Sequence, residues 1–193
     1  MNRESGVTGL QGHRVELQSY SFNIVSVCSV LFNNFALQNL WIMRLEIYDS
    51  KNLNFVELNC TGSDDRYIKC DPESRFLDTD VYNLFDDCFE KANNLYEYYE
   101  PTKFNARYIV PLRNRLLTSL TILERIKTLS EFQEFIMSKV HGKDFLIRLV
   151  RDDKNWTDRW MFYHEKLVKI NKDLINFVDY CIDEDRILWV IGY

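Results

Sequence analysis

One pair of residues in the sequence has the types and spacing that suit acid–base chemistry on a phosphate. Arg159 and His164 are separated by four residues at the start of an apolar helical pattern. A histidine transfers protons near neutral pH, and an arginine stabilises the negative charge that develops at a reacting phosphorus centre. A helix N-terminus adds a field that favours phosphate. The reaction that such a pair could catalyse is cleavage of RNA by its own 2′-hydroxyl.

The spacing of Arg159 and His164 resembles the Arg-x4-His signature of the HEPN nucleases. Members of this family are helical bundles of toxin and defence systems that cut RNA, without a metal, in a composite site at a dimer interface. The resemblance covers residues 159–164 and the helical pattern, although Trp160 stands where the family often has a polar residue. A second, partial match begins at Arg113 but ends in a threonine. The resemblance implies that Arg159 stabilises the phosphate and that His164 is the general acid–base.

The competing interpretation of His164 is a half-buried histidine on the inner side of a helix. The sequence contains no glycine-rich phosphate loop, no Gly-x-Ser-x-Gly elbow and no His-Glu-x-x-His motif. Cys60 and Cys70 lack the second ligand pair that a zinc site needs, so we predict neither a metal nor a cofactor. We therefore favour a non-catalytic, protein-binding regulatory module of the immunity, antitoxin or accessory-subunit type. A HEPN-like ribonuclease is the alternative.

The aromatic content of the chain points to an interface. The sequence holds 13 Phe, 11 Tyr and 4 Trp, and several helical segments place bulky rings on more than one face. A core cannot accept rings from every face of a helix, and Tyr and Trp are enriched where proteins meet. We predict that a protein partner or a second copy of the chain binds the surplus rings, which are Trp156, Trp160, Phe162, Tyr163, Tyr96 and Tyr98.

Charge is unevenly distributed along the chain. The net charge is −5, which leaves no global signature of nucleic-acid binding, but residues 103–151 hold ten basic and four acidic side chains. This excess could meet an acidic partner or a phosphate backbone, RNA included, and it could equally be an ordinary solvated helix face. The binding candidates in this stretch are Arg107, Arg113 and Arg115.

The sequence predicts a cytoplasmic protein without a membrane span. The five cysteines form no Cys-x-x-Cys pair and are odd in number, which suits a reducing compartment better than a disulfide framework. The first sixteen residues lack the apolar core of a signal peptide. No apolar run approaches the length of about 18 residues that a bilayer requires.

The expected fold is mainly α, an antiparallel bundle of about five to six helices. Glycine and proline are scarce (6 and 3), which argues against a sandwich or barrel with its frequent turns. Residues 1–15 are predicted to form a flexible tail, and 16–193 a single domain. Apolar residues spaced by three and four predict helices over 17–35, 79–99, 102–126, 131–140, 144–150 and 155–181.

A small β element is expected beside the bundle, from residues 43–58 and 186–191. Apolar and polar residues alternate over 43–48, turn residues follow at 49–52, and 53–58 suits a returning strand. A helix that continues to about Asp49 fits the same residues equally well. The β-prone segment 186–191 could pair with such a hairpin. Residues 59–78 are polar and predict a long loop that is functional or mobile.

Overall fold

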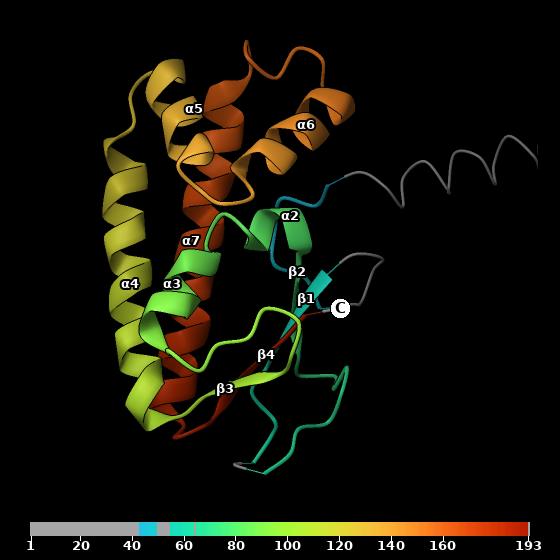
Figure 1. Cartoon of the computed structure of the whole chain (residues 1–193), viewed down its shortest axis with the longest axis vertical. Coiled ribbons are helices and arrows are strands. Elements are labelled where there is room, and N and C mark those ends of the chain that lie inside the picture. Colours follow the sequence, from blue (N-terminus) through green and yellow to red (C-terminus); the bar gives the residue numbers. More distant parts are fainter. Residues whose placement is uncertain (1–42, 50–54, 64, 193) are drawn as a thin grey trace, which may run out of the picture. The chain divides into compact units, whose positions relative to one another are not determined.

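The computed structural model describes residues 43–49, 55–63 and 65–192, and this part of the chain contains six helices and four strands (Figure 1). A mainly helical fold is confirmed, but the sheet is more than a small element. The predicted tail at 1–15 and the predicted helix at 17–35 lie outside the described residues. The elements, in chain order, are β1 (Phe55–Asn59), β2 (Arg75–Asp78), α2 (Thr79–Tyr82), α3 (Asp86–Ala92), β3 (Thr102–Phe104), α4 (Ala106–Arg125), α5 (Leu129–Met137), α6 (Gly142–Asp152), α7 (Trp160–Asp183) and β4 (Leu188–Gly192).

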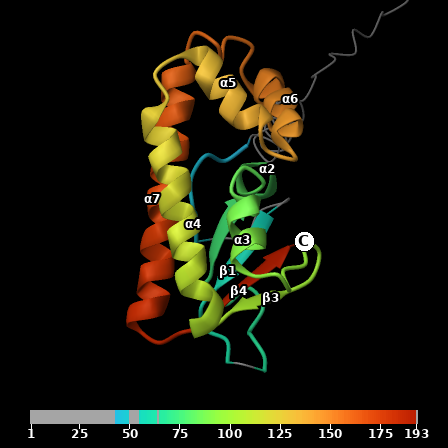
Figure 2. The same cartoon turned by 60° about the vertical axis from the view of Figure 1, so that its left-hand side comes forward.

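Helices α4 and α7 are the two longest and pack side by side in opposite directions (Figures 1 and 2). His164 near the start of α7 contacts the carbonyl of Leu123 near the end of α4. At the other end of the pair, Arg113 of α4 forms an ion pair with Asp179 of α7. The predicted antiparallel packing is therefore confirmed for this pair, and their apolar faces are buried along its length, at Leu112, Leu116, Leu123, Leu167, Leu174 and Val178.

The four strands form one antiparallel sheet in the order β2-β1-β4-β3. Every residue of β1 is buried, because this strand has a neighbour on each side. Glu57 in its middle is fully buried, and its Oε1 accepts hydrogen bonds from Asn59 Nδ2 (3.0 Å), Cys70 N (2.8 Å) and Ser74 Oγ (2.7 Å). These donors compensate the carboxylate for lost hydration and hold the 60–74 loop against the sheet.

The predicted β element is right in its pairing with the C-terminal segment and wrong in its hairpin. Strand β4 pairs with β1, as expected, but the hairpin partner of β1 is β2, which lies inside the predicted 59–78 loop. Residues 43–49 contribute a single bridge, between Tyr48 and Phe76 on the outer side of β2. The four residues of β2 gave no periodic signal because polar residues surround so short a strand.

The single helix predicted over 79–99 is two short helices followed by turns. Asn83 ends α2, and Asn93 ends α3, where its side chain accepts from Leu95 N and donates to Lys103 O. The apolar spacing of the sequence suggested one continuous helix because buried apolar residues recur every three or four positions through both helices. Beyond Asn93 the pattern fails, since Leu95 and Tyr99 are 67% and 86% exposed. Residue 102 begins β3 rather than a helix, and α4 starts at Ala106, ahead of Pro111.

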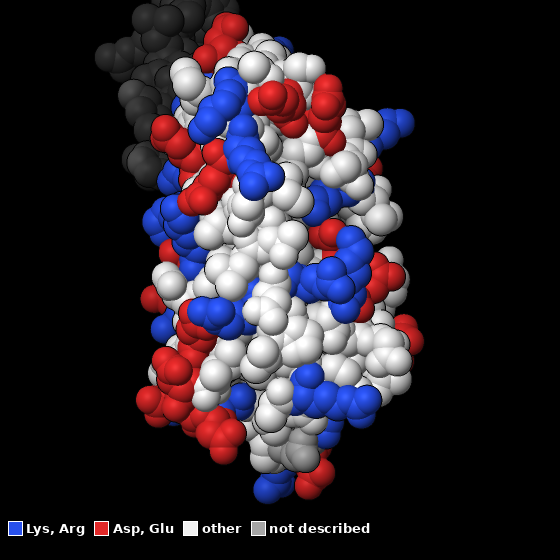
Figure 3. Space-filling model, turned by 90° about the vertical axis from the view of Figure 1, so that its left-hand side faces the viewer, with Lys and Arg blue, Asp and Glu red and all other residues white. Residues whose placement is uncertain are grey.

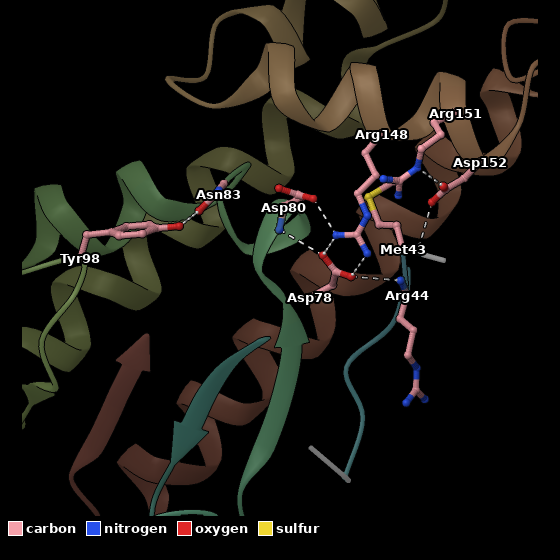
Figure 4. Close-up of polar contacts among 9 residues, drawn as sticks. All are labelled: Met43, Arg44, Asp78, Asp80, Asn83, Tyr98, Arg148, Arg151 and Asp152. Carbon is pink, nitrogen blue, oxygen red and sulfur yellow. Dashed lines mark hydrogen bonds and ion pairs between the residues drawn. The ribbon is translucent and has the colours of Figure 1, made fainter. Parts of the chain in front are cut away.

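Arg148 attaches α6 to the junction of β2 and α2 (Figure 4). Its guanidinium contacts both carboxylate oxygens of Asp78 at 2.8 Å and Asp80 at 2.6 Å. Asp78 also caps α2 by accepting from Asp80 N, and it accepts from Arg44 N at 3.4 Å. Met43 N donates to Asp152 at the end of α6 (3.0 Å). One buried cluster of charge thus joins α6, α2 and the 43–49 segment.

Candidate functional site

Arg159 immediately precedes α7 and is engaged by its own surroundings. Its guanidinium donates to Asp153 Oδ2 at 3.0 Å and lies over the rings of Phe162 (5.2 Å) and Tyr163 (5.9 Å). Tyr163 donates its hydroxyl to the same carboxylate oxygen at 2.7 Å. These contacts stabilise the turn that leads into α7, so Arg159 has a structural role.

His164 has contacts of a different kind and with other partners. Its Nε2 lies 2.8 Å from the Leu123 carbonyl, and its ring packs against Phe132 and Trp160. A proton on Nε2 is needed for this bond, because a carbonyl only accepts. Among the described residues, no hydrogen bond or ion pair joins Arg159 to His164. The partial match at Arg113 is likewise engaged, by Asp179.

The aromatic residues predicted to form an interface are largely internal. Trp156 and Tyr163 are buried, and Trp160 is half-buried against Phe132. Phe162 is the member of this group that stays exposed, at 42%, and Arg159 and Lys166 lie over its ring. The aromatic rings of this group thus pack mainly where α5, the 153–159 turn and α7 meet.

Tyr96 and Tyr98 lie in the turns that follow α3, remote in sequence from the α7 group. The Tyr96 hydroxyl contacts that of Tyr82 at 2.9 Å, and Tyr98 donates to Asn83 Oδ1 at 2.6 Å (Figure 4). Burial raises the pKa of both phenols above the ordinary value. Their polar ends therefore stabilise the α2–α3 region, and the neighbouring Tyr99 has an exposed ring (86%).

The basic stretch 103–151 is partly neutralised by acidic residues from earlier in the chain. Lys139 contacts Asp87 at 2.8 Å, and Arg148 contacts Asp78 and Asp80. Arg113 is paired with Asp179. The uneven charge of the sequence is thus in part a set of internal ion pairs between its two halves.

Arg107 and Arg115 differ from Arg113. Both are exposed, and neither forms an ion pair with another described residue. Arg107 lies over the Tyr108 ring at 5.4 Å, near the start of α4. Arg115 lines a small cavity between α3 and α4. Of the predicted basic binding residues, these two remain available to a partner.

The cavity beside Arg115, here the α3–α4 pocket, has a volume of about 110 Å³. Lys91 and Lys139 contact opposite oxygens of Asp87 in it, at 2.9 and 2.8 Å. Burial alone would raise the pKa of Asp87, but these two ammonium groups outweigh that effect and hold it below the usual value. Its lining consists of three cations, one carboxylate, two hydroxyls, one thiol and one apolar side chain: Asp87, Cys88, Lys91, Arg115, Thr118, Ser119, Ile122 and Lys139.

Sequence reasoning missed most of this pocket. Asp87, Lys91 and Lys139 are not among the residues that the sequence analysis selects. The spacing of Asp87 and Lys91, four residues apart on a helix, was the available signal. Lys139 enters from the segment after α5, which no local pattern could reveal.

The outward side of α4 continues from the pocket as a band of uncharged polar residues with an arginine at each end. Between Ala106 and Leu123 the helix has no acidic residue, and its exposed side is formed by Arg107, Asn114, Thr118, Thr121 and Arg125. Figure 3 views this side of the molecule and shows white side chains along its length, with both basic and acidic side chains at the margins. Val110 and Ile122 flank the band and are 46% and 50% exposed. We call this surface, with the α3–α4 pocket at its edge, the α4 face.

Two further findings bear on function. Within 43–49, 55–63 and 65–192, no helix has the length and apolarity to cross a bilayer. Comparison of the chain with models of known protein families, with curated proteins and with solved structures finds no match.

Proposed function

We propose that this chain is a non-catalytic protein-binding module and that its contact surface is the α4 face. The immunity, antitoxin and accessory-subunit classes all contain modules of this kind. The observation that carries the proposal is the α3–α4 pocket, where Arg115 lies beside two lysines that already share one carboxylate. A second carboxylate, supplied by a partner, would pair with Arg115 and reduce the remaining positive charge of the pocket.

The chemistry of the partner follows from the residues around the pocket. Arginine binds a carboxylate through two parallel hydrogen bonds and is enriched among residues that dominate binding energy. Ile122 next to the pocket offers apolar contact, and Asn114, Thr118 and Thr121 offer polar contact without charge. The surface therefore suits a protein segment that carries Asp or Glu beside an apolar side chain. Arg107 and Arg125 at the two ends of the band favour the same acidic partner.

The test uses three probes of different chemistry on the isotopically labelled full chain. These are an amphipathic glutamate-rich peptide, the same peptide with lysine in place of glutamate, and a single-stranded RNA oligonucleotide. We expect the acidic peptide to shift the amide resonances of Lys91, Arg115 and Thr118. Arg115→Gln should weaken this binding about tenfold, because it removes one charge-assisted contact. The control Lys143→Gln, on the exposed side of α6, removes the same charge and should leave the affinity unchanged.

Two results would contradict the proposal. One is the absence of any shift on the α4 face with the acidic peptide at low salt. The other is stronger binding of RNA than of the peptide to the same residues, which would assign the basic surface to nucleic acid. Weaker binding of the peptide in 0.5 M salt is expected, since screening reduces attraction between exposed charges.

A further inference from the structure

Cys60 and Cys181 are distant in sequence, and the sheet brings them together. Cys60 directly follows β1, and Cys181 lies in the last turn of α7. After α7 the chain turns back, with Arg186 N donating to Cys181 O at 2.8 Å, and enters β4. Strand β4 pairs with β1 so that Asn59 faces Trp189. The residue after Asn59 is thereby placed against the end of α7.

The two thiols interact with each other and with one arginine. The Cys60 and Cys181 thiols lie within hydrogen-bonding reach of each other, and Arg186 lies close to both. The hydrogen bond from Cys181 and the charge of Arg186 outweigh burial and the nearby Glu73, and they lower the pKa of Cys60 to about 7. The same hydrogen bond and burial raise the pKa of Cys181. The pKa of Cys60 thus lies below that of Cys181, which makes Cys60 the more reactive of the two thiols near neutral pH.

Solvent-filled space reaches Cys60 from two sides. One cavity, of about 540 Å³, is lined by Cys60 and by side chains of α7, among them Phe177 and Tyr180. The second, of about 490 Å³, is lined by Cys60, Arg186 and the loop after β1. Both cavities have room for a small polar oxidant beside Cys60, of whose surface 3% is exposed. Cys88 is a contrasting case, because burial there raises the pKa of the thiol to about 12.

We propose that Cys60 and Cys181 are a redox pair that hydrogen peroxide converts into an intramolecular disulfide. In the first step the Cys60 thiolate attacks one peroxide oxygen. The O–O bond breaks, an S–O bond forms, and the departing hydroxide takes a proton to leave as water. In the second step the Cys181 sulfur attacks the sulfenic acid of Cys60, the S–O bond breaks, and the Cys181 proton leaves with the hydroxyl as water. Two thiols are oxidised by two electrons, and one peroxide becomes two waters.

The disulfide would connect the end of the central strand β1 to the end of the longest helix. It would close a loop of about 120 residues, and cross-links of that span restrict the unfolded chain strongly. We expect oxidation to raise the melting temperature by about 5–15 °C and a thiol reductant to reverse the change.

The test treats the full chain with graded hydrogen peroxide at pH 7.4 and maps the products by mass spectrometry without reduction. Wild type should lose two hydrogens and yield one cross-linked peptide that contains Cys60 and Cys181. Cys181→Ser should instead accumulate a sulfenic acid on Cys60, which dimedone traps. Cys60→Ser should give neither product at the same dose, whereas the controls Cys70→Ser and Cys88→Ser should behave as wild type.

A second measurement depends on no variant and separates this pair from an inert buried thiol. The rate at which iodoacetamide modifies Cys60 in the wild-type chain should rise with pH through a midpoint near 7. An ordinary free thiol has its midpoint near 8.5. A cross-link between other cysteines, or no reaction of Cys60 before the chain unfolds, would overturn the proposal.

Discussion

Arg148 connects α6 to two carboxylates, Asp78 and Asp80, that lie far away in the sequence. Its side chain and that of Asp78 are 12% and 5% exposed, and they connect α6 to the start of α2. Burial raises the pKa of Asp78 even though the guanidinium of Arg148 opposes that effect. The ion pair therefore offsets the desolvation cost of burying Asp78. It stabilises the fold by keeping this buried carboxylate paired with a cation.

Replacement of Arg148 with Met should lower the free energy of unfolding by about 3–5 kcal/mol at pH 7, because Asp78 keeps its buried charge without its cation. Urea denaturation measures this loss. The loss should be smaller at pH 4, since the variant raises the folded-state pKa of Asp78 further, and protonation then removes the uncompensated charge. Arg151→Met is the control on the same helix. Its partner contact with Asp152 is exposed, and we expect a change below about 1 kcal/mol. Equal effects of the two substitutions would refute this account.

At the scale of single elements, the start of α5 shows how a cap is chosen. The sequence offers two hydroxyl residues, Thr128 and Ser130, that could cap this helix. The structure uses Thr128, whose hydroxyl accepts from Glu131 N at 3.2 Å while Glu131 accepts from Thr128 N at 3.1 Å. This reciprocal pair satisfies two donors of the helix end, whereas a cap at Ser130 would satisfy one and shorten the helix.

Thr128→Ala should destabilise the chain by about 1 kcal/mol, because it leaves a helix donor without its acceptor. The measurement is the midpoint of urea unfolding at constant slope. Ser130→Ala, two residues away, serves as the matched control and should change stability by less than about 0.5 kcal/mol. If the Ser130 variant proves the less stable of the two, the cap was assigned to the wrong residue.

At the scale of the whole described chain, the short last strand β4 holds the sheet together. Strand β4 lies between β1 and β3, so it supplies hydrogen bonds to two neighbours and buries Leu188, Val190 and Ile191. It also positions Arg186 and thereby the two thiols at the end of α7. The five residues 188–192 thus connect the sheet to the helical pair.

Truncation after Ile187 should abolish cooperative unfolding above 25 °C, because β1 and β3 would lose the strand that joins them. Circular dichroism and calorimetry read this directly. Truncation after Gly192, which removes Tyr193 alone, is the control and should unfold cooperatively within a few degrees of the full chain. A cooperative transition in the shorter chain would show that the helices fold without the completed sheet.

The sequence by itself determined the helical pair α4–α7, helices α5 and α6 to within a few residues, and the pairing of the C-terminal segment with β1. In each case a repeated apolar spacing or a run of β-branched residues carried the information locally. Tertiary structure decided the rest. The partner of β1, the break at Asn83, the burial of Tyr163 and the α3–α4 pocket all depend on residues that approach from elsewhere in the chain. So does the meeting of Cys60 and Cys181, because contact between distant residues is set by packing and strand order, which no local period encodes.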